Sequence, residues 1–184
     1  MKPINNYANI QANSGEFSRP TAGGYIIRIL DVTDVPLDPA TKKGDYLKID
    51  YDICEGEFAN YYKEANKRFG GEWYANFIRS YKEKALGMFK HFTNCIEESN
   101  AGFEWNWIES ELIGKKIGVT MQEEEYIKSD GSIGVRLRVK DIKTVKQIAT
   151  GDFKVPERKT VERPATASNN GFVEVDLDED LPFA

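Results

Sequence analysis

Apolar and polar residues alternate strictly between residues 45 and 54, which is the pattern of a strand with one buried face. The apolar positions of this segment are Leu47, Ile49, Tyr51 and Ile53. Apolar and aromatic residues bounded by Gly, Pro or acidic turns predict two more strands, at 25–35 and 58–63. The first part of the chain is therefore predicted to form three consecutive strands.

A helical period follows, from about residue 79 to residue 99. Apolar residues recur there at spacings of three and four, which gives a helix one apolar stripe. The stripe consists of Tyr81, Ala85, Met88, Phe89, Phe92, Cys95 and Ile96. Alternation returns at 116–122 and 134–142 and predicts a fourth and a fifth strand, the fifth with Val135, Leu137 and Val139 facing inward.

Three strands, one helix and two strands make the element order of the OB-fold, a five-stranded Greek-key barrel with a helix between strands 3 and 4. A parallel βαβ sheet fits less well, because it needs a helix after nearly every strand. We expect this mainly-β barrel over residues 21–155, after a flexible N-terminal arm at 1–20. A disordered linker at 156–170 and an acidic tip at 171–184 are expected to follow.

The acidic charge of the chain is concentrated in this tip. Residues 171–184 hold five acidic and no basic side chains, in a chain whose formal net charge is −5. The rest of the chain is therefore close to neutral, and local basic patches on it are compatible with a polyanionic partner. A carboxylate run closed by Leu181-Pro182-Phe183 can dock on a basic pocket of a partner or act only as a solubilising tail.

Basic and aromatic residues are interleaved between residues 61 and 84. Single-stranded nucleic acid is held by cationic grooves with aromatic rings on which bases stack. We predict that the DNA-binding residues are Tyr61, Tyr62, Lys63, Lys67, Arg68, Phe69, Trp73, Tyr74, Arg79 and Lys82, together with Arg136, Arg138 and Lys140 on the outward face of the fifth strand. A merely solvated face is the alternative for these last three.

Several aromatic residues have a structural alternative. Strand alternation predicts that one of Tyr61 and Tyr62 faces the core, and Phe77 and Tyr81 are assigned to the core as well. The strongest ligand candidates are Trp73 and Tyr74, because a Gly-flanked loop has no periodic reason to be apolar. Stacking on bases and packing between helix and barrel both fit Trp105 and Trp107.

The sequence contains no recognisable catalytic motif, and we expect neither an enzyme, a cofactor nor a metal site. His91 is the only histidine and falls on the amphipathic helix, while Cys54 and Cys95 have no zinc-type spacing. A Mg²⁺-dependent nuclease built on Glu123-Glu-Glu125 is disfavoured, because adjacent residues of a strand point to opposite faces. The chain has no apolar run of membrane-spanning length and no signal-peptide core, so we expect a cytoplasmic location and no membrane partner.

Three segments resemble those of single-stranded DNA-binding proteins of phages and integrative elements of Gram-positive bacteria: 46–58, 77–86 and 151–157. The ending Asp178-Glu-Asp-Leu-Pro-Phe183 is similar to the acidic tip of bacterial single-stranded DNA-binding proteins, with Leu181 in place of Ile and Ala184 after the final Phe. The resemblance implies an OB-fold that coats single-stranded DNA during replication, recombination or repair.

The same resemblance implies that the tip recruits processing enzymes through Asp178, Glu179, Asp180, Leu181, Pro182 and Phe183. A homo-oligomer is compatible with it, since many OB-fold binders act as dimers or tetramers. The alternative function is that of an adaptor in a replication or recombination complex, which binds protein and not DNA.

Overall fold

The computed structural model describes residues 18–161. The first half contains the strands β1 (Gly23–Val35), β2 (Tyr46–Ile53) and β3 (Asn76–Ser80) and the helix α1 (Tyr61–Phe69). The second half contains α2 (Leu86–Ser99), β4 (Lys116–Ile127), β5 (Ile133–Lys143) and α3 (Val145–Ala149). Most of the predicted N-terminal arm, most of the predicted linker and all of the acidic tip lie outside the described residues.

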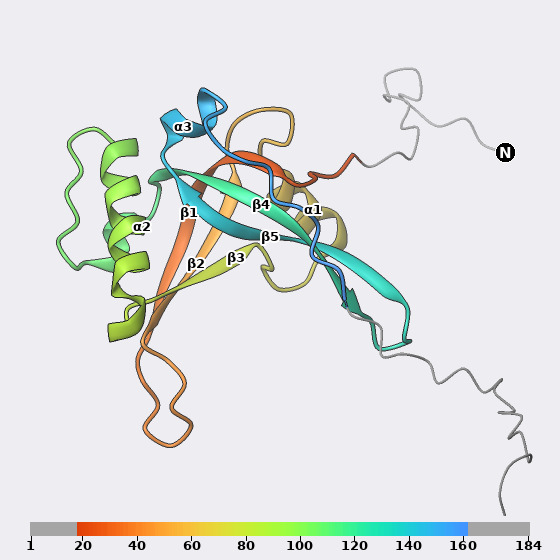
Figure 1. Ribbon diagram of the computed structural model, residues 1–184, viewed down its shortest axis with the longest axis horizontal. Helices are drawn as coiled ribbons and strands as arrows, with labels where there is room; N and C mark the ends of the chain where they lie inside the picture. The colour runs from red at the N-terminus through yellow and green to blue at the C-terminus, as the bar shows by residue number, and fades with distance from the viewer. Residues whose placement is uncertain (1–17, 162–184) are drawn as a thin grey trace, which may run out of the picture.

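The five strands form one antiparallel sheet in the order β3-β2-β1-β4-β5 (Figure 1). The prediction of a mainly-β protein with five strands and a helix between strands 3 and 4 is thus confirmed. Among residues 18–161, no ladder joins β3 to β5, so the sheet is open between these two strands. Figure 1 shows α2 and α1 near opposite ends of the sheet.

The long strand β1 is shared between the two halves of the sheet. It pairs with β2 from Ile27 to Val35 and with β4 from Gly23 to Arg28. A register shift between Ile29 and Asp31 marks a bulge, and bulges bend a strand and increase its twist. This bend brings the two halves of the sheet toward each other around one core.

The core follows the alternation of the sequence. The predicted inward residues of β2 are all buried, as are Ile117, Val119 and Met121 of β4. Helix α2 adds Phe89, Phe92, Cys95 and Ile96. The stripe prediction is wrong for Met88, which is 68% exposed. Trp105 and Trp107 lie with ring centroids 6.3 and 6.2 Å from that of Phe89. Trp105 packs against the core, as the packing interpretation expects, whereas Trp107 is 72% exposed.

The predicted third strand at 58–63 is wrong, because the chain forms α1 there and β3 comes later. Asn60 has a left-handed backbone with φ 61°, which turns the chain away from the extended path of β2. The first turn of α1 is then held by a carboxylate of β2, that of Asp52. Local alternation cannot reveal a cap supplied from a neighbouring strand.

The predicted helix also begins too early. Residue 79 lies in β3, and α2 begins only at Leu86 after a short 3₁₀ turn at Glu83–Ala85. Tyr81 lies before the helix, where its hydroxyl donates a hydrogen bond to Asp34 Oδ1 at 2.7 Å. The strands β4 and β5 extend beyond their predicted ends, and α3 was not predicted; a capping box between Thr144 and Gln147 fixes its start.

Candidate functional site

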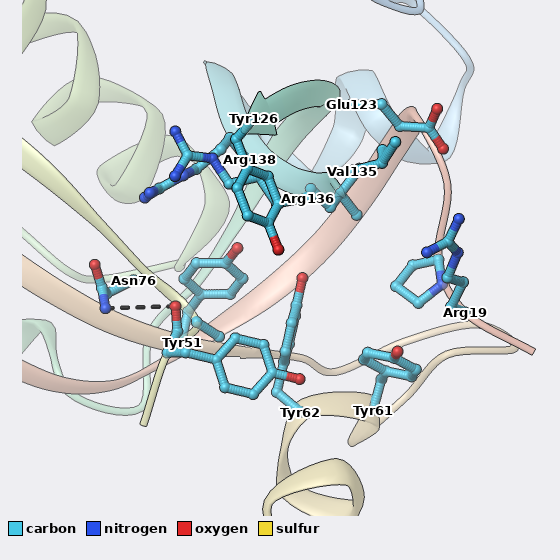
Figure 2. A pocket seen from close by; sticks show the side chains of 14 residues that line it. Arg19, Tyr51, Tyr61, Tyr62, Asn76, Glu123, Tyr126, Val135, Arg136 and Arg138 are labelled. Atoms are coloured by element: carbon cyan, nitrogen blue, oxygen red, sulfur yellow. Dashed lines mark hydrogen bonds between the residues drawn. The ribbon is translucent and has the colours of Figure 1, made fainter. Parts of the chain in front are cut away.

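A groove of about 520 Å³ lies between the open edges of the sheet, and we call it the β3–β5 groove. One wall comes from β2, α1, the segment before β3 and the first residue of β3: Tyr51, Tyr61, Tyr62, Tyr74, Ala75 and Asn76. The opposite wall comes from β4 and β5: Glu123, Tyr126, Val135, Arg136, Leu137 and Arg138. Arg19 and Pro20, which precede β1, complete the lining. Figure 2 shows Tyr126, Arg136 and Arg138 facing Tyr51, Tyr61 and Tyr62.

Four tyrosines of the first wall pack as one cluster around Tyr62. The Tyr62 ring meets those of Tyr51, Tyr61 and Tyr74 edge to face, with centroid distances of 5.6, 5.2 and 5.5 Å. Edge-to-face contacts are a favoured geometry for aromatic pairs and fix the rings relative to one another. Tyr62 itself is 5% exposed, whereas Tyr74 is 58% exposed, so Tyr74 presents ring surface at the groove.

The carboxylate of Asp52 connects this cluster to the sheet. Its Oδ1 accepts hydrogen bonds from the backbone N–H groups of Ile53 and Tyr62 at 2.8 and 3.0 Å. Its Oδ2 accepts one from the backbone N–H of Lys63 at 3.0 Å. Burial raises the pKa of Asp52, and the three N–H donors oppose this shift by stabilising the carboxylate. Asp52 thus takes the place of an N-cap for α1, where Asn60 makes no side-chain cap.

The tyrosine hydroxyls of the wall stay protonated at neutral pH. Burial raises the pKa of Tyr51 to about 12 and raises the pKa of Tyr62 as well. Desolvation also raises the pKa values of Tyr61 and Tyr74. The wall is therefore uncharged, but its hydroxyls can donate or accept hydrogen bonds at the edges of a ligand.

On the opposite wall, Tyr126 lies beside Arg136. The guanidinium carbon of Arg136 is 5.5 Å from the Tyr126 ring centroid, within the range of a cation–π contact. The ring has room because Gly134 stands opposite Tyr126 in the β4–β5 ladder. A Cβ atom at Gly134 would lie 2.6 Å from the Tyr126 ring. A glycine at this position therefore allows the ring to lie across β5.

The charged groups of the groove are mainly positive. Arg19, Arg136 and Arg138 line it against a single carboxylate, that of Glu123. The charge of Arg138 acts on the Tyr51 hydroxyl and that of Arg19 on the Tyr61 hydroxyl, in each case opposing the rise of the pKa. The cations therefore lie close to the tyrosine cluster, and the groove combines aromatic surface with positive charge.

The structure brings five of the predicted DNA-binding residues together in the groove: Tyr61, Tyr62, Tyr74, Arg136 and Arg138. Tyr62 faces inward as expected, although it does so from a helix and not from a strand. The lining also includes residues that the sequence analysis did not select: Arg19, Tyr51, Asn76 and Tyr126. Arg19 was assigned to the arm and Tyr51 to the core, and only the pairing of Tyr126 with Gly134 could have indicated a ring at the surface.

The other predicted residues lie outside this lining. Four of them, Lys63, Lys67, Arg68 and Phe69, are exposed on α1. Lys82 donates to the Lys42 carbonyl at 3.2 Å, and Arg79 lies over Phe77, 5.0 Å from the ring centroid. Lys140 is exposed farther along β5. The half-buried Trp73 packs against the core, and its Nε1 donates to the Ala75 carbonyl at 3.0 Å.

Comparison with protein-family models and with curated proteins finds no match to this chain. Within residues 18–161, no three side chains of His, Cys, Asp or Glu gather in a way that could hold a metal ion. The helices of this described part are all too short or too polar to cross a membrane. The β3–β5 groove is thus characterised by its own geometry: tyrosines, arginines and an open strand edge.

Proposed function

We propose that the protein binds single-stranded DNA in the β3–β5 groove with little sequence preference. The observation that carries the proposal is the convergence of five tyrosines and three arginines on one groove. Tyr51 and Tyr62 are buried and support the wall, so the rings open to a base are those of Tyr61, Tyr74 and Tyr126. Every base has a π-face, so stacking on these rings tolerates any sequence, while arginines attract phosphates. The tyrosine hydroxyls and Asn76 add hydrogen-bonding groups without imposing one pattern.

We further propose that the sheet is an OB-type barrel that is open between β3 and β5. The order β3-β2-β1-β4-β5 is that of a five-stranded OB barrel interrupted between these two strands, and OB barrels are often partly open. The charge of Asp141 on β5 acts on the Arg79 guanidinium of β3, which supports proximity of the two edges. The opening between β3 and β5 would then be the place where the single-stranded DNA enters.

The size of the groove favours single strands over duplex. Its volume of about 520 Å³ suits one or two bases rather than a helix. Bases in a duplex are stacked on each other and would have to leave that stack to contact Tyr74 or Tyr126. We therefore propose a coating and protecting role in replication, recombination or repair of phage or mobile-element DNA in a bacterial cytoplasm. Recruitment of enzymes by the acidic tip remains part of this proposal and lies outside the described residues.

A protein-binding adaptor is the second candidate. It is favoured by exposed apolar side chains on the α2 side of the molecule, away from the groove. Trp107 is 72% exposed, Met88 68% and Leu86 45%. Such surfaces serve protein contacts more often than DNA contacts.

Fluorescence anisotropy of a labelled oligo(dT) titrated with the protein separates the two functions. The three tryptophans do not line the groove, so a label on the DNA is a better reporter than tryptophan quenching. We expect Tyr74→Ala to weaken binding by roughly 1–3 kcal/mol, the contribution of one stacked base. Phe69→Ala is the matched control, since it removes an exposed ring of α1 outside the groove and should leave affinity unchanged. No binding by the wild-type protein would favour the adaptor.

A further inference from the structure

Residues 157–161 lie along β4 beyond the end of β1, and we call them the 157–161 strap. The last residue of β4 that pairs with β1 is Met121, opposite Gly23. Past that point Lys159 forms backbone hydrogen bonds with β4. Its N–H donates to the Glu123 carbonyl and its carbonyl accepts from the Glu125 N–H, both at 2.9 Å. The Gln122 side chain also donates to the Glu157 carbonyl at 2.7 Å. The strap therefore extends the sheet by a short parallel bridge.

The strap lies against an acidic stretch of β4, Glu123 to Glu125. In the ladder with β5, Glu123 stands opposite Leu137 and Glu125 opposite Val135. Leu137 and Val135 line the β3–β5 groove, and so does Glu123. The side chains of Glu123 and Glu125 are only 14% and 19% exposed, so water screens their charges poorly. Left alone, these two carboxylates would repel a phosphate chain in the groove.

Arg158 of the strap contacts both carboxylates. Its Nε lies 2.9 Å from Glu123 Oε2, and its guanidinium lies 3.8 Å from Glu125 Oε1. The intervening Glu124, on the other face of β4, is contacted by Lys159 at 3.6 Å and by Arg136 at 3.2 Å. The strap thus supplies a cation to each of the three acids, and Arg158 contacts both Glu123, which lines the groove, and Glu125, which stands opposite the groove residue Val135.

We infer that Arg158 is a positioning residue for nucleic-acid binding: it neutralises Glu123 and Glu125 and so keeps the groove receptive to a polyanion, without itself contacting the DNA. The inference rests on the proposed function of the groove. It also explains why an acidic stretch borders a site lined by three arginines. The nearly buried carboxylates of β4 are compatible with the fold because Arg158 and Lys159 of the strap pair with them.

Affinity for labelled oligo(dT) measured at several salt concentrations tests this role. We expect Arg158→Ala to weaken binding on the order of three- to tenfold at low salt, as one to two unscreened carboxylates near a phosphate would. The difference should shrink as salt rises, because screening replaces the missing guanidinium. A loss that stays constant across salt concentrations would point to a damaged fold and overturn the inference.

Removing the acids distinguishes neutralisation of Glu123 and Glu125 by Arg158 from direct contact between Arg158 and DNA. In the Arg158→Ala background, Glu123→Gln with Glu125→Gln should restore wild-type affinity; a persistent loss would mean that Arg158 touches DNA itself and overturns the inference. The same two Gln substitutions with Arg158 intact should bind at least as tightly as wild type, and weaker binding contradicts it.

Lys146→Ala is the charge-matched control, since it removes one cation from α3, away from the groove. An equal loss of affinity in Lys146→Ala and Arg158→Ala would show that the loss depends only on the net charge of the protein, and it would overturn the inference. The wild-type titration keeps the two proposals apart. If the wild-type protein does not bind oligo(dT), both the proposed function and the inference fail. If the wild-type protein binds and Arg158→Ala binds equally well, only the inference fails.

Discussion

Asp52 on β2 accepts a hydrogen bond from the backbone N–H of Tyr62 at 3.0 Å, and this contact fixes the tyrosine cluster to the sheet. The neighbouring N–H of Lys63 binds the other carboxylate oxygen at the same distance. A helix start held from a strand cannot rotate independently of that strand. The orientation of Tyr61 and Tyr62 in the groove therefore depends on a residue that does not line it.

We predict that Asp52→Ala destabilises the protein by about 1–3 kcal/mol, because buried N–H groups lose their acceptor. Asp52→Asn should cost less, since its side-chain oxygen can still accept from Tyr62. Urea unfolding measures stability, and oligo(dT) anisotropy measures the effect on the groove. Equal stability of wild type and Asp52→Ala would show that the contact does not hold α1.

The buried tyrosines predict a loss of stability at alkaline pH. The ordinary tyrosine pKa is 10.0, whereas burial raises the pKa of Tyr51 to about 12. Between these values the unfolded chain releases the proton and the folded chain keeps it, so the folded state binds more protons and its stability falls as pH rises. The slope is about 1.4 kcal/mol per pH unit for each such tyrosine.

Urea unfolding at a series of pH values from 9 to about 11.5 measures this slope. In Tyr51→Phe the contribution of Tyr51 is absent at every pH, so the decline above pH 10 should be shallower than in wild type. Parallel curves for the two proteins would show that Tyr51 does not resist ionisation. Tyr81→Phe is a second test, because desolvation and the hydrogen bond to Asp34 raise the pKa of Tyr81 to about 12 as well, so its decline should also be shallower.

Gly134→Ala should displace the Tyr126 ring. The added Cβ would lie 2.6 Å from the ring, and the side chain can yield by turning away from β5. If a base stacks on Tyr126, Gly134→Ala should weaken oligo(dT) binding by roughly as much as Tyr126→Ala, about 1–3 kcal/mol. Gly87→Ala serves as control, because no atom lies within 4 Å of its Cβ position in α2. Affinity unchanged by both groove substitutions would place the DNA elsewhere.

The sheet was largely predictable from the sequence, and the groove was not. Period-two burial marks most of β2 and β5, because one face of each strand is covered more than the other. The start of α1 depends on Asp52, which follows no local pattern. The groove depends on two open edges that approach in space, so Tyr62 and Arg136 meet across it although 74 residues separate them in the chain.

Trp73 combines a loop position with a side chain that is packed in place. Its Gly-flanked position predicts a DNA contact. In the structure its side chain packs against the core and its indole N–H donates a hydrogen bond to the Ala75 carbonyl. We now expect Trp73→Ala to lower stability by about 3 kcal/mol, in the lower range of large-to-small core substitutions. Oligo(dT) affinity, measured where the variant is still folded, should stay near the wild-type value. A stable Trp73→Ala variant that binds oligo(dT) weakly would show that Trp73 contacts the DNA.

The acidic tip gives the last prediction, which rests on the sequence alone. Removing residues 171–184 changes the formal net charge from −5 to 0 and deletes a polyanion that can compete for the arginines of the groove. We expect the truncated protein to fold normally and to bind oligo(dT) at least as tightly as the full chain. Recovery of replication or repair enzymes in pull-downs should be lost.

Phe183→Ala should reproduce most of that loss, since Phe183 is the only aromatic group at the very end. It leaves all five acids of the tip in place and therefore serves as the control for charge. If Phe183→Ala recovers enzymes as well as the full chain while the truncation does not, recruitment depends on the carboxylates. Equal recovery by full-length and truncated protein would leave the tip a solubilising role, and the proposed function would then rest on the β3–β5 groove alone.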